Sequence, residues 1–140
     1  IGGGGLASGV AASIKRLLPA ARVIGVEPEG AASMRKALDE ERPVVIKKID
    51  TIADGLAPVI AGELTYEHAF SLMDDVVTVS DDAIREATSL LVSKQKLIVE
   101  FSGAAATAAL LSKAVEAEDQ RVAVVISGGN LDPTLLAGMA

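Results

Sequence analysis

Four consecutive glycines stand at positions 2–5, immediately before a segment whose apolar residues recur at helical spacing. Backbone N–H groups of a glycine-rich loop that leads into a helix can converge on an anion, because the helix N-terminus carries unpaired donors. A flexible linker is the alternative interpretation, since glycine runs also join domains. Linkers rarely lead directly into an amphipathic helix, so the pattern favours an anion-binding loop.

The glycine loop matches neither of two common nucleotide-binding motifs. A dinucleotide motif in this register requires glycine at position 8, where the chain has Ser8. A Walker loop requires lysine where the chain has Val10. Glu27 ends a predicted strand at a distance that suits a ribose hydroxyl, which keeps a nucleotide-binding α/β domain as an alternative. The loop is predicted to bind a phosphate-like anion outside both motifs.

Three further stretches place polar groups where strands or loops meet helices. Ser127 ends an aliphatic run and is followed by two glycines, Glu100 precedes a helix of small residues, and Gly55 lies in an apolar loop. An ordinary turn explains the Ser127 stretch equally well, and Glu100 can be a partner of the helix dipole alone. Because ligands of open α/β sheets gather at the carboxyl ends of strands, the Ser127 stretch is a candidate ligand site.

Alternating aliphatic and amphipathic segments must position these groups. Aliphatic runs predict three buried strands, and the spacing of apolar residues predicts four helices. Ser80 has the type and place of a helix N-cap. Strands that alternate with helices predict an α/β fold with an open, mostly parallel sheet and helices on both faces. The predicted strands are residues 23–27, 76–79 and 122–126, and the predicted helices are residues 6–18, 65–72, 81–94 and 103–118.

Composition limits the class of protein. Half of the 140 residues are apolar but only three are aromatic, which predicts one domain with a core of small aliphatic side chains. The net charge of −6 argues against binding to nucleic acids or anionic membranes, which require basic patches. No apolar run reaches the roughly 20 residues of a membrane span. The absence of cysteine excludes disulfides and favours a cytoplasmic location.

Five stretches, in chain order, resemble motifs of the pyridoxal-phosphate enzymes of the tryptophan-synthase-β fold type, or fold type II. The resemblance is strongest to threonine (serine) dehydratases and serine racemases. It covers nearly the whole chain and rests on the order of the motifs, each of which is weak alone. The stretches are GGGGL at 2–6, VEP at 26–28, TIADG at 51–55, EFSGA at 100–104 and SGGN at 127–130.

This resemblance implies pyridoxal 5'-phosphate as the cofactor and assigns residues to it. Ser127 would hydrogen-bond the pyridine nitrogen, Gly55 would lie against the ring, and Glu100 would line the active site. A hydroxyl does not hold that nitrogen protonated as a carboxylate does, which weakens the ring as an electron sink and suits prompt elimination of water. The cofactor phosphate would be held by backbone N–H groups of Gly2, Gly3, Gly4, Gly5 and Leu6.

The chain departs from the family pattern at two positions. Phe101 stands where proline usually follows the glutamate. The resemblance also implies a cation bound by Glu27 and the carbonyl of Ala31, but Ser33 occupies the position of the usual aspartate. One anionic ligand is few for a divalent ion, so a weak or monovalent cation site is the better expectation.

In the family, the lysine that binds the cofactor covalently lies upstream of the glycine loop, and no lysine of this chain has that motif context. Residues 1–140 are therefore expected to be the C-terminal portion of one catalytic domain, inactive alone. The parent protein is expected to be a homo-oligomeric (dimeric or tetrameric) threonine or serine ammonia-lyase of amino-acid metabolism, as in isoleucine biosynthesis. Serine racemase and a non-catalytic interaction module are the alternatives.

Several residues of chemically useful types are predicted to have no role in catalysis. His68, the single histidine, is expected at the surface. Four aspartates are predicted to be solvated charges of turns and helix starts rather than metal ligands, and the methionines are predicted to fill a core or interface. These residues are Asp74, Asp75, Asp81 and Asp82, and Met34, Met73 and Met139.

Overall fold

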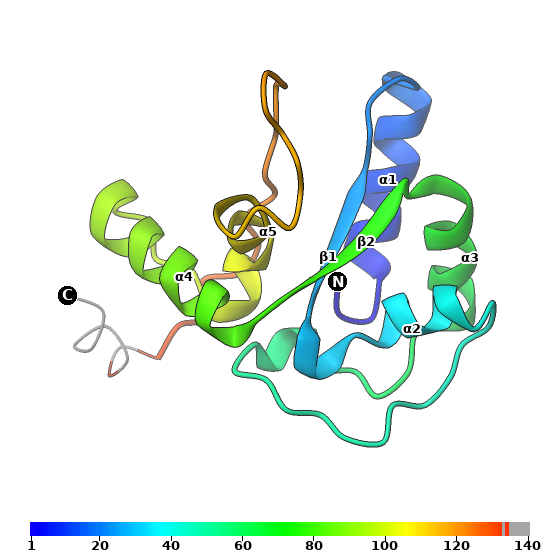
Figure 1. Cartoon of the computed structure of the whole chain (residues 1–140), viewed down its shortest axis with the longest axis horizontal. Coiled ribbons are helices and arrows are strands. Elements are labelled where there is room, and N and C mark those ends of the chain that lie inside the picture. Colours follow the sequence, from blue (N-terminus) through cyan, green and yellow to red (C-terminus); the bar gives the residue numbers. More distant parts are fainter. Residues whose placement is uncertain (133, 135–140) are drawn as a thin grey trace.

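Two parallel strands lie at the centre of the computed structural model, which describes residues 1–132 and 134 and therefore leaves the prediction about Met139 outside it (Figure 1). Strand β1 (Ile24–Pro28) pairs with β2 (Asp75–Val79), with Val26 opposite Val77. Aliphatic strands without polar alternation are typical of a sheet that is covered on both faces. The first two predicted strands are confirmed to within one residue at each end.

Helices cover both faces of this sheet, as predicted. Figure 1 shows α4 (Asp81–Gln95) and α5 (Phe101–Leu111) on one side of the strands. On the other side lie α1 (Gly5–Leu17), α2 (Ser33–Asp39) and α3 (Glu63–Leu72). The α/β fold class is confirmed. Two short 3₁₀ helices lie in the connections, η1 (Glu29–Ala31) and η2 (Asp54–Leu56).

Neighbouring side chains of β2 point into two separate cores. Val76 is buried with Met34, and Met73 packs against the same cluster. Val79 is buried on the opposite face with Ile84 of α4. Alanines supply many of the remaining buried side chains, especially along α5, so helices approach the sheet closely. The predictions of a small-residue core and of core positions for two methionines are confirmed.

The four predicted helices begin close to their predicted starts, three of them also end close to their predicted ends, and α2 was not predicted. The Ser80 hydroxyl accepts a hydrogen bond from the N–H of Ala83 at 3.2 Å, which confirms it as the N-cap of α4. Helix α5 ends at Leu111, well before residue 118, because Lys113 has a left-handed φ of 59°. None of the described helices is long and apolar enough to cross a membrane.

The third predicted strand is wrong. Residues 122–126 adopt no strand, and Val122 and Val125 are each 48% exposed. A strand requires a hydrogen-bonded neighbour, and no segment of the described chain pairs with this one. The aliphatic run therefore has the composition of a strand, but no described segment lies beside it to complete a hydrogen-bonded pair.

Candidate cofactor site

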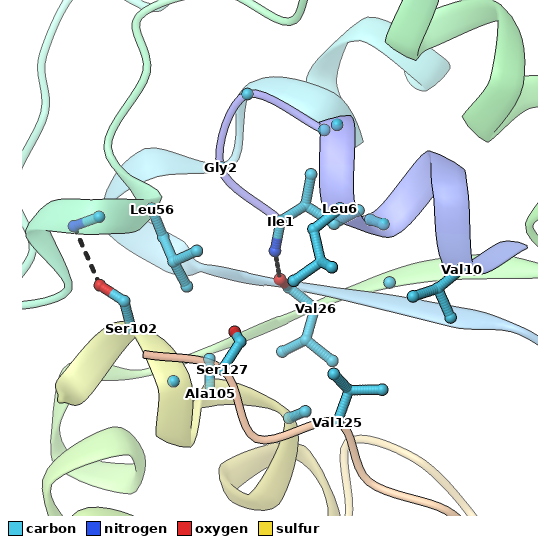
Figure 2. A pocket seen from close by; sticks show the side chains of 18 of the residues that line it. Ile1, Gly2, Leu6, Val10, Val26, Leu56, Ser102, Ala105, Val125 and Ser127 are labelled. Atoms are coloured by element: carbon cyan, nitrogen blue, oxygen red, sulfur yellow. Dashed lines mark hydrogen bonds between the residues drawn. The ribbon is translucent and has the colours of Figure 1, made fainter. Parts of the chain in front are cut away.

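A cavity of about 340 Å³ opens between the start of α1, strand β1 and the start of α5. Figure 2 shows Leu6 and Val10 of α1 on one side, Val125 and Ser127 on the other, and Val26 of β1 between them. Its volume lies within the range of small-molecule sites, about 300–1,000 Å³. Every residue to which the resemblance assigned a cofactor role lies on its wall: Gly2, Gly3, Gly4, Gly5, Leu6, Gly55, Glu100 and Ser127.

Helix α3 holds the glycine loop in place. Gly4 is the N-cap of α1 and has a φ of 87°, a left-handed conformation that favours glycine. A Cβ at Gly4 would lie 2.6 Å from the side chain of Thr65. The Thr65 hydroxyl donates a hydrogen bond to the carbonyl of Gly3 at 2.9 Å. Thr65, which lies in the first turn of α3, therefore holds the loop in place. The sequence did not indicate this role.

The loop presents backbone donors to the cavity without any cationic side chain. The N–H groups of residues 5–7 begin α1 and donate to no acceptor in the part of the chain that the structure describes. A Cβ built at Gly3 or Gly5 would meet no atom within 4 Å, so both face open space. Among the described residues that line the cavity, Glu100 is the one with a charged side chain. An anion here would be bound by N–H groups and the helix dipole.

The opposite wall includes Gly55, which is tied to the start of α5. Its N–H is shared between the hydroxyl of Ser102 and the carboxylate of Asp54, each at 2.9 Å (Figure 2 draws the first bond). Ser102 is buried and lies next to Phe101, whose ring packs partly against the core as the first residue of α5. The sequence motif contained Ser102, but its contact with Gly55 was not predicted.

Asp81, predicted to be a solvated charge, accepts two hydrogen bonds from the same wall segment. Its carboxylate oxygens accept from the Thr51 hydroxyl at 2.7 Å and from the N–H of Ile52 at 2.9 Å. Asp81 begins α4, where a carboxylate is also favoured by the helix dipole. The prediction of a charge at a helix start is confirmed, but its two hydrogen bonds were not predicted, because a partner 30 residues away cannot be recognised from the local pattern.

Ser127 is held by hydrogen bonds between its loop and Glu100, the N-cap of α5. The N–H of Glu100 donates to the carbonyl of Gly128 at 3.3 Å, and the N–H of Asn130 donates to the Glu100 carboxylate at 3.0 Å. A Cβ at Gly103 would lie 2.0 Å from the Ser127 carbonyl. Only glycine at position 103 allows this approach, which brings the Ser127 hydroxyl to the cavity.

Glu27 lies away from the cavity and is fully buried. Its carboxylate accepts hydrogen bonds from the N–H groups of Met34 at 2.9 Å and Arg35 at 2.7 Å, in the first turn of α2. Burial raises the pKa of Glu27, and these two N–H donors oppose the shift. The buried hydroxyl of Ser33, the first residue of α2, has no hydrogen-bond partner in the described part of the chain. Within the described ranges, no group of three or more acidic, histidine or cysteine residues is placed so that it could hold a metal ion.

Asp74 and His68 lie outside the cavity. The Asp74 carboxylate accepts from the Lys15 ammonium and from the N–H of Val23, both at 2.7 Å, so it joins α1 to the start of β1. These bonds lower the pKa of Asp74, which was predicted to be only a solvated charge. The Nδ1 of His68 lies 2.8 Å from the carbonyl of Leu64, one turn earlier in α3.

The sequence profile of the family described as pyridoxal-phosphate dependent enzyme matches residues 1–128. The chain belongs to this family. The predicted resemblance is confirmed, and with it the family's use of pyridoxal phosphate. The convergence of the five motifs at or beside one cavity is the structural counterpart of that match.

Individual relatives are similar over nearly the whole chain. The L-threonine ammonia-lyase of Thermotoga maritima is 38% identical over 136 residues, which are 97% of this chain and 34% of that protein. The solved structure of the T.th. threonine deaminase has a TM-score of 0.89 and 37% identity, covering 94% of this chain and 48% of that chain. Maize serine racemase has a TM-score of 0.90 and 36% identity, with coverages of 99% and 43%. The chain thus spans less than half the length of each relative.

Proposed function

We propose that this chain is the C-terminal, cofactor-binding portion of one catalytic domain in a threonine (serine) dehydratase. The enzyme would deaminate L-threonine to 2-oxobutanoate and ammonia, or L-serine to pyruvate and ammonia. One observation carries the proposal: five segments distant in sequence meet at one cavity, and among the described residues its end at the glycine loop has N–H donors but no cationic side chain. The names of the ammonia-lyase and deaminase relatives support the substrate class.

The groups on the cavity wall fit pyridoxal phosphate. The unpaired N–H groups of residues 5–7 suit a phosphate, and the open space beside Gly3 and Gly5 leaves room for it. The apolar side chains of Leu6 and Leu56 suit the faces of an aromatic ring. When bound, this cofactor withdraws electrons from the α-carbon of an amino acid.

Ser127 and Glu100 give the ring end of the cavity its polarity. We expect the Ser127 hydroxyl to donate a hydrogen bond to the pyridine nitrogen without protonating it, because a hydroxyl is a far weaker acid than a pyridinium. That favours elimination of the substrate hydroxyl over a long-lived carbanion. Glu100 lines the same cavity, and its carboxylate is oriented by the N–H of Asn130.

The full-length protein that contains this chain provides the test. Purified with pyridoxal phosphate, it should release 2-oxo acid from L-threonine or L-serine. Ser127→Ala should lower kcat/KM by roughly ten- to a hundredfold, since it removes the proposed partner of the ring nitrogen. A polypeptide of residues 1–140 alone should give no product, because no lysine of this chain has the motif context of the cofactor lysine. Product from residues 1–140, or none from the full-length protein, would contradict the proposal.

Serine racemase is the second candidate, favoured by the structural similarity to the maize enzyme. Both activities use the same cofactor site, so the cavity supports both. Chiral chromatography separates them: a racemase converts L-serine to D-serine, whereas a dehydratase consumes L-serine and accumulates pyruvate. D-serine formed faster than pyruvate would replace the first proposal with the second.

We propose a weak, monovalent cation site at Glu27 and the carbonyl of Ala31. The buried, unpartnered hydroxyl of Ser33 supports it, because an oxygen without a hydrogen-bond partner is a ready ligand for a hard cation. Thermal unfolding in potassium, in magnesium and in tetramethylammonium chloride tests it. A higher melting temperature in potassium, lost in Glu27→Gln, is expected.

We further propose that the protein is cytoplasmic and a homo-oligomer that acts on a small amino acid. The absence of cysteine supports a reducing compartment. Exposed apolar side chains on α1 and α3, such as Leu17 and Phe70, leave surface for subunit contacts. Light scattering coupled to size exclusion should give the mass of a dimer or tetramer, and a monomer would contradict the proposal.

A further inference from the structure

Residues 51–56 form part of the cavity region yet contain no regular structure except the short η2. Connecting segments are usually more mobile than the helices and strands they join, so a wall built from one needs tethers. Hydrogen bonds in the described part of the chain supply two. One tether comes from Asp81 at the start of α4, and the other comes from Ser102 at the start of α5.

Asp81 fixes the beginning of the segment. Its two oxygens accept from the Thr51 hydroxyl and the Ile52 N–H, and the Thr51 oxygen in turn accepts from the N–H of Ala53 at 3.1 Å. Ala53 is completely buried in the core beneath α4 and α5. The segment is therefore anchored up to residue 53. Beyond it, the Leu56 N–H donates to the Ala53 carbonyl at 2.8 Å and Leu56 packs against the same core, while Ser102 supplies the hydrogen bond that joins Gly55 to α5.

Ser102 fixes the end of the segment through Gly55. The Ser102 side chain is buried, and its oxygen accepts the Gly55 N–H at 2.9 Å. Asp54 accepts the same N–H at the same distance, but Asp54 belongs to the segment itself. Of the two acceptors, only Ser102 connects Gly55 to a helix. The two hydrogen bonds have the same length, but only the bond to Ser102 joins the segment to α5.

Gly55 fills the gap between the glycine loop and α5. A Cβ at Gly2 would lie 2.6 Å from the carbonyl oxygen of Gly55. A Cβ at Gly55 would lie 2.9 Å from the hydroxyl of Ser102 and 3.6 Å from the carboxylate of Glu100. Any movement of Gly55 therefore changes the width of the cavity between its two walls.

We propose that Ser102 is a positioning residue, whose hydroxyl holds Gly55 against α5 and so fixes the wall on which the cofactor ring rests. The part that concerns the ring rests on the proposed function. The tether itself needs no ligand, so it can be tested separately. Ser102 touches Gly55 rather than any reacting atom, and it acts through the place of that residue.

Hydrogen exchange in the cofactor-free, full-length protein tests the tether. Ser102→Ala removes the acceptor on α5, Ser102→Thr keeps a hydroxyl there, and Asp54→Ala removes the acceptor that belongs to the segment. Ser102→Ala should speed amide exchange across residues 53–57 about fivefold, as expected for one lost hydrogen bond. Ser102→Thr should stay within about twofold of wild type, and Asp54→Ala should change exchange less than Ser102→Ala does.

Titration with pyridoxal phosphate tests the effect on the cavity. Ser102→Ala should weaken binding about fivefold and shift the emission spectrum of the bound cofactor, and Ser102→Thr should restore both. The emission spectrum reports the surroundings of the ring. A variant that is only less stable, with an unchanged cavity, would therefore show the wild-type spectrum.

The outcomes separate the tether from the proposed function. Unchanged exchange in Ser102→Ala, or equal exchange in Ser102→Ala and Asp54→Ala, overturns the tether. Faster exchange with unchanged affinity and emission overturns the positioning role. If wild type binds no pyridoxal phosphate, the proposed function and the role toward the ring both fail, while the exchange data still decide the tether.

Discussion

Strand β2 and residues 122–126 are two aliphatic segments of the same kind with opposite surroundings. In β2, Val76 and Val79 are each 2% exposed, and every residue is paired with β1. In the second segment, Val122 and Val125 are each 48% exposed, and no described strand lies beside it. A β-branched sequence supplies propensity, but a pairing partner and covering helices decide whether a strand forms.

The two segments also reach the cavity in different ways. Strand β1, fixed by its pairing with β2, contributes Val26 to the wall. Residues 122–126 lead to Ser127, whose loop is attached to α5 through Glu100 and Gly103. The wall at Val26 is therefore held along the length of a strand, whereas the wall at Ser127 is held only by contacts close to Ser127. Substitutions at each attachment should separate the two cases.

Gly103→Ala should have the largest effect, because it acts on the attachment of the unpaired segment. The added Cβ would lie 2.0 Å from the Ser127 carbonyl, so the loop must move. We expect a loss of about 3 kcal/mol in the free energy of unfolding and at least tenfold weaker binding of pyridoxal phosphate. Urea denaturation and cofactor titration measure these changes.

Gly9→Ala is the matched control. Gly9 is exposed within α1, and an added Cβ would meet no atom within 4 Å. This variant should gain up to about 1 kcal/mol through helix propensity. Equal losses in both variants would show that the contact with Ser127 is unimportant.

Val76→Ala and Val122→Ala test the comparison between the segments directly. Val76 is 2% exposed, so its truncation should cost about 2 kcal/mol through lost burial and a new cavity. Val122 is half exposed, and the same change should cost less than about 0.5 kcal/mol. Similar costs in urea denaturation of the full-length protein would indicate that residues 122–126 are covered there as β2 is.

Asp74→Asn should lower the free energy of unfolding at neutral pH, and this loss should disappear in acid, where Asp74 of the wild type is itself protonated. The bonds from Lys15 and from the N–H of Val23 lower the pKa of Asp74 below its ordinary value of 3.8. A depressed pKa stabilises the fold above that value, and the stabilisation is lost as the pH falls through the lower, folded-state pKa. Because Asp74 is exposed, the effect should stay below about 1 kcal/mol.

Unfolding free energies measured from pH 6 down to pH 2 provide this measurement. Asp74→Asn should flatten the slope below pH 4 and leave the slope above pH 5 unchanged. Asp82→Asn, which removes a carboxylate paired with Arg85 on the surface of α4, is the control. A slope that is flattened equally in both would refute a specific role for Asp74.

Lys113→Gly should have the smallest effect, at the point where α5 ends and the chain turns toward residues 122–126. Lys113 has a left-handed φ of 59°, which glycine adopts without steric cost. We expect a gain of about 0.5 kcal/mol in thermal or urea unfolding. Lys94→Gly, inside α4, should instead lose about 1 kcal/mol. A loss in both would mean that the left-handed turn is unimportant.

Local patterns predicted most of the fold. The starts of α1 and α4, the Ser80 cap and the two paired strands follow from spacing and residue type within a few positions. The failures involve information outside the local window. Residues 122–126 lack a partner, and α5 ends at the backbone conformation of Lys113, whose type does not favour that turn.

The candidate site was predictable where its residues stand in motifs. Gly55, Glu100 and Ser127 were named from short stretches, and the structure brings them to one cavity with the glycine loop. The residues that hold these site residues in place were not predictable. Asp81 and Thr65 act on partners 30 and 62 residues away, and nothing in the spacing of their own segments encodes those partners.

The hydrogen bond from Thr65 to Gly3 has a consequence for folding kinetics. It closes a loop of 62 residues, and its entropic cost is smaller once α3 and the paired strands have formed and hold the two segments near each other. The glycine loop should therefore reach its final shape late, after the rate-limiting step of folding. A ligand of that loop would then leave the folding rate unchanged and slow unfolding, which lengthens the lifetime of the native state.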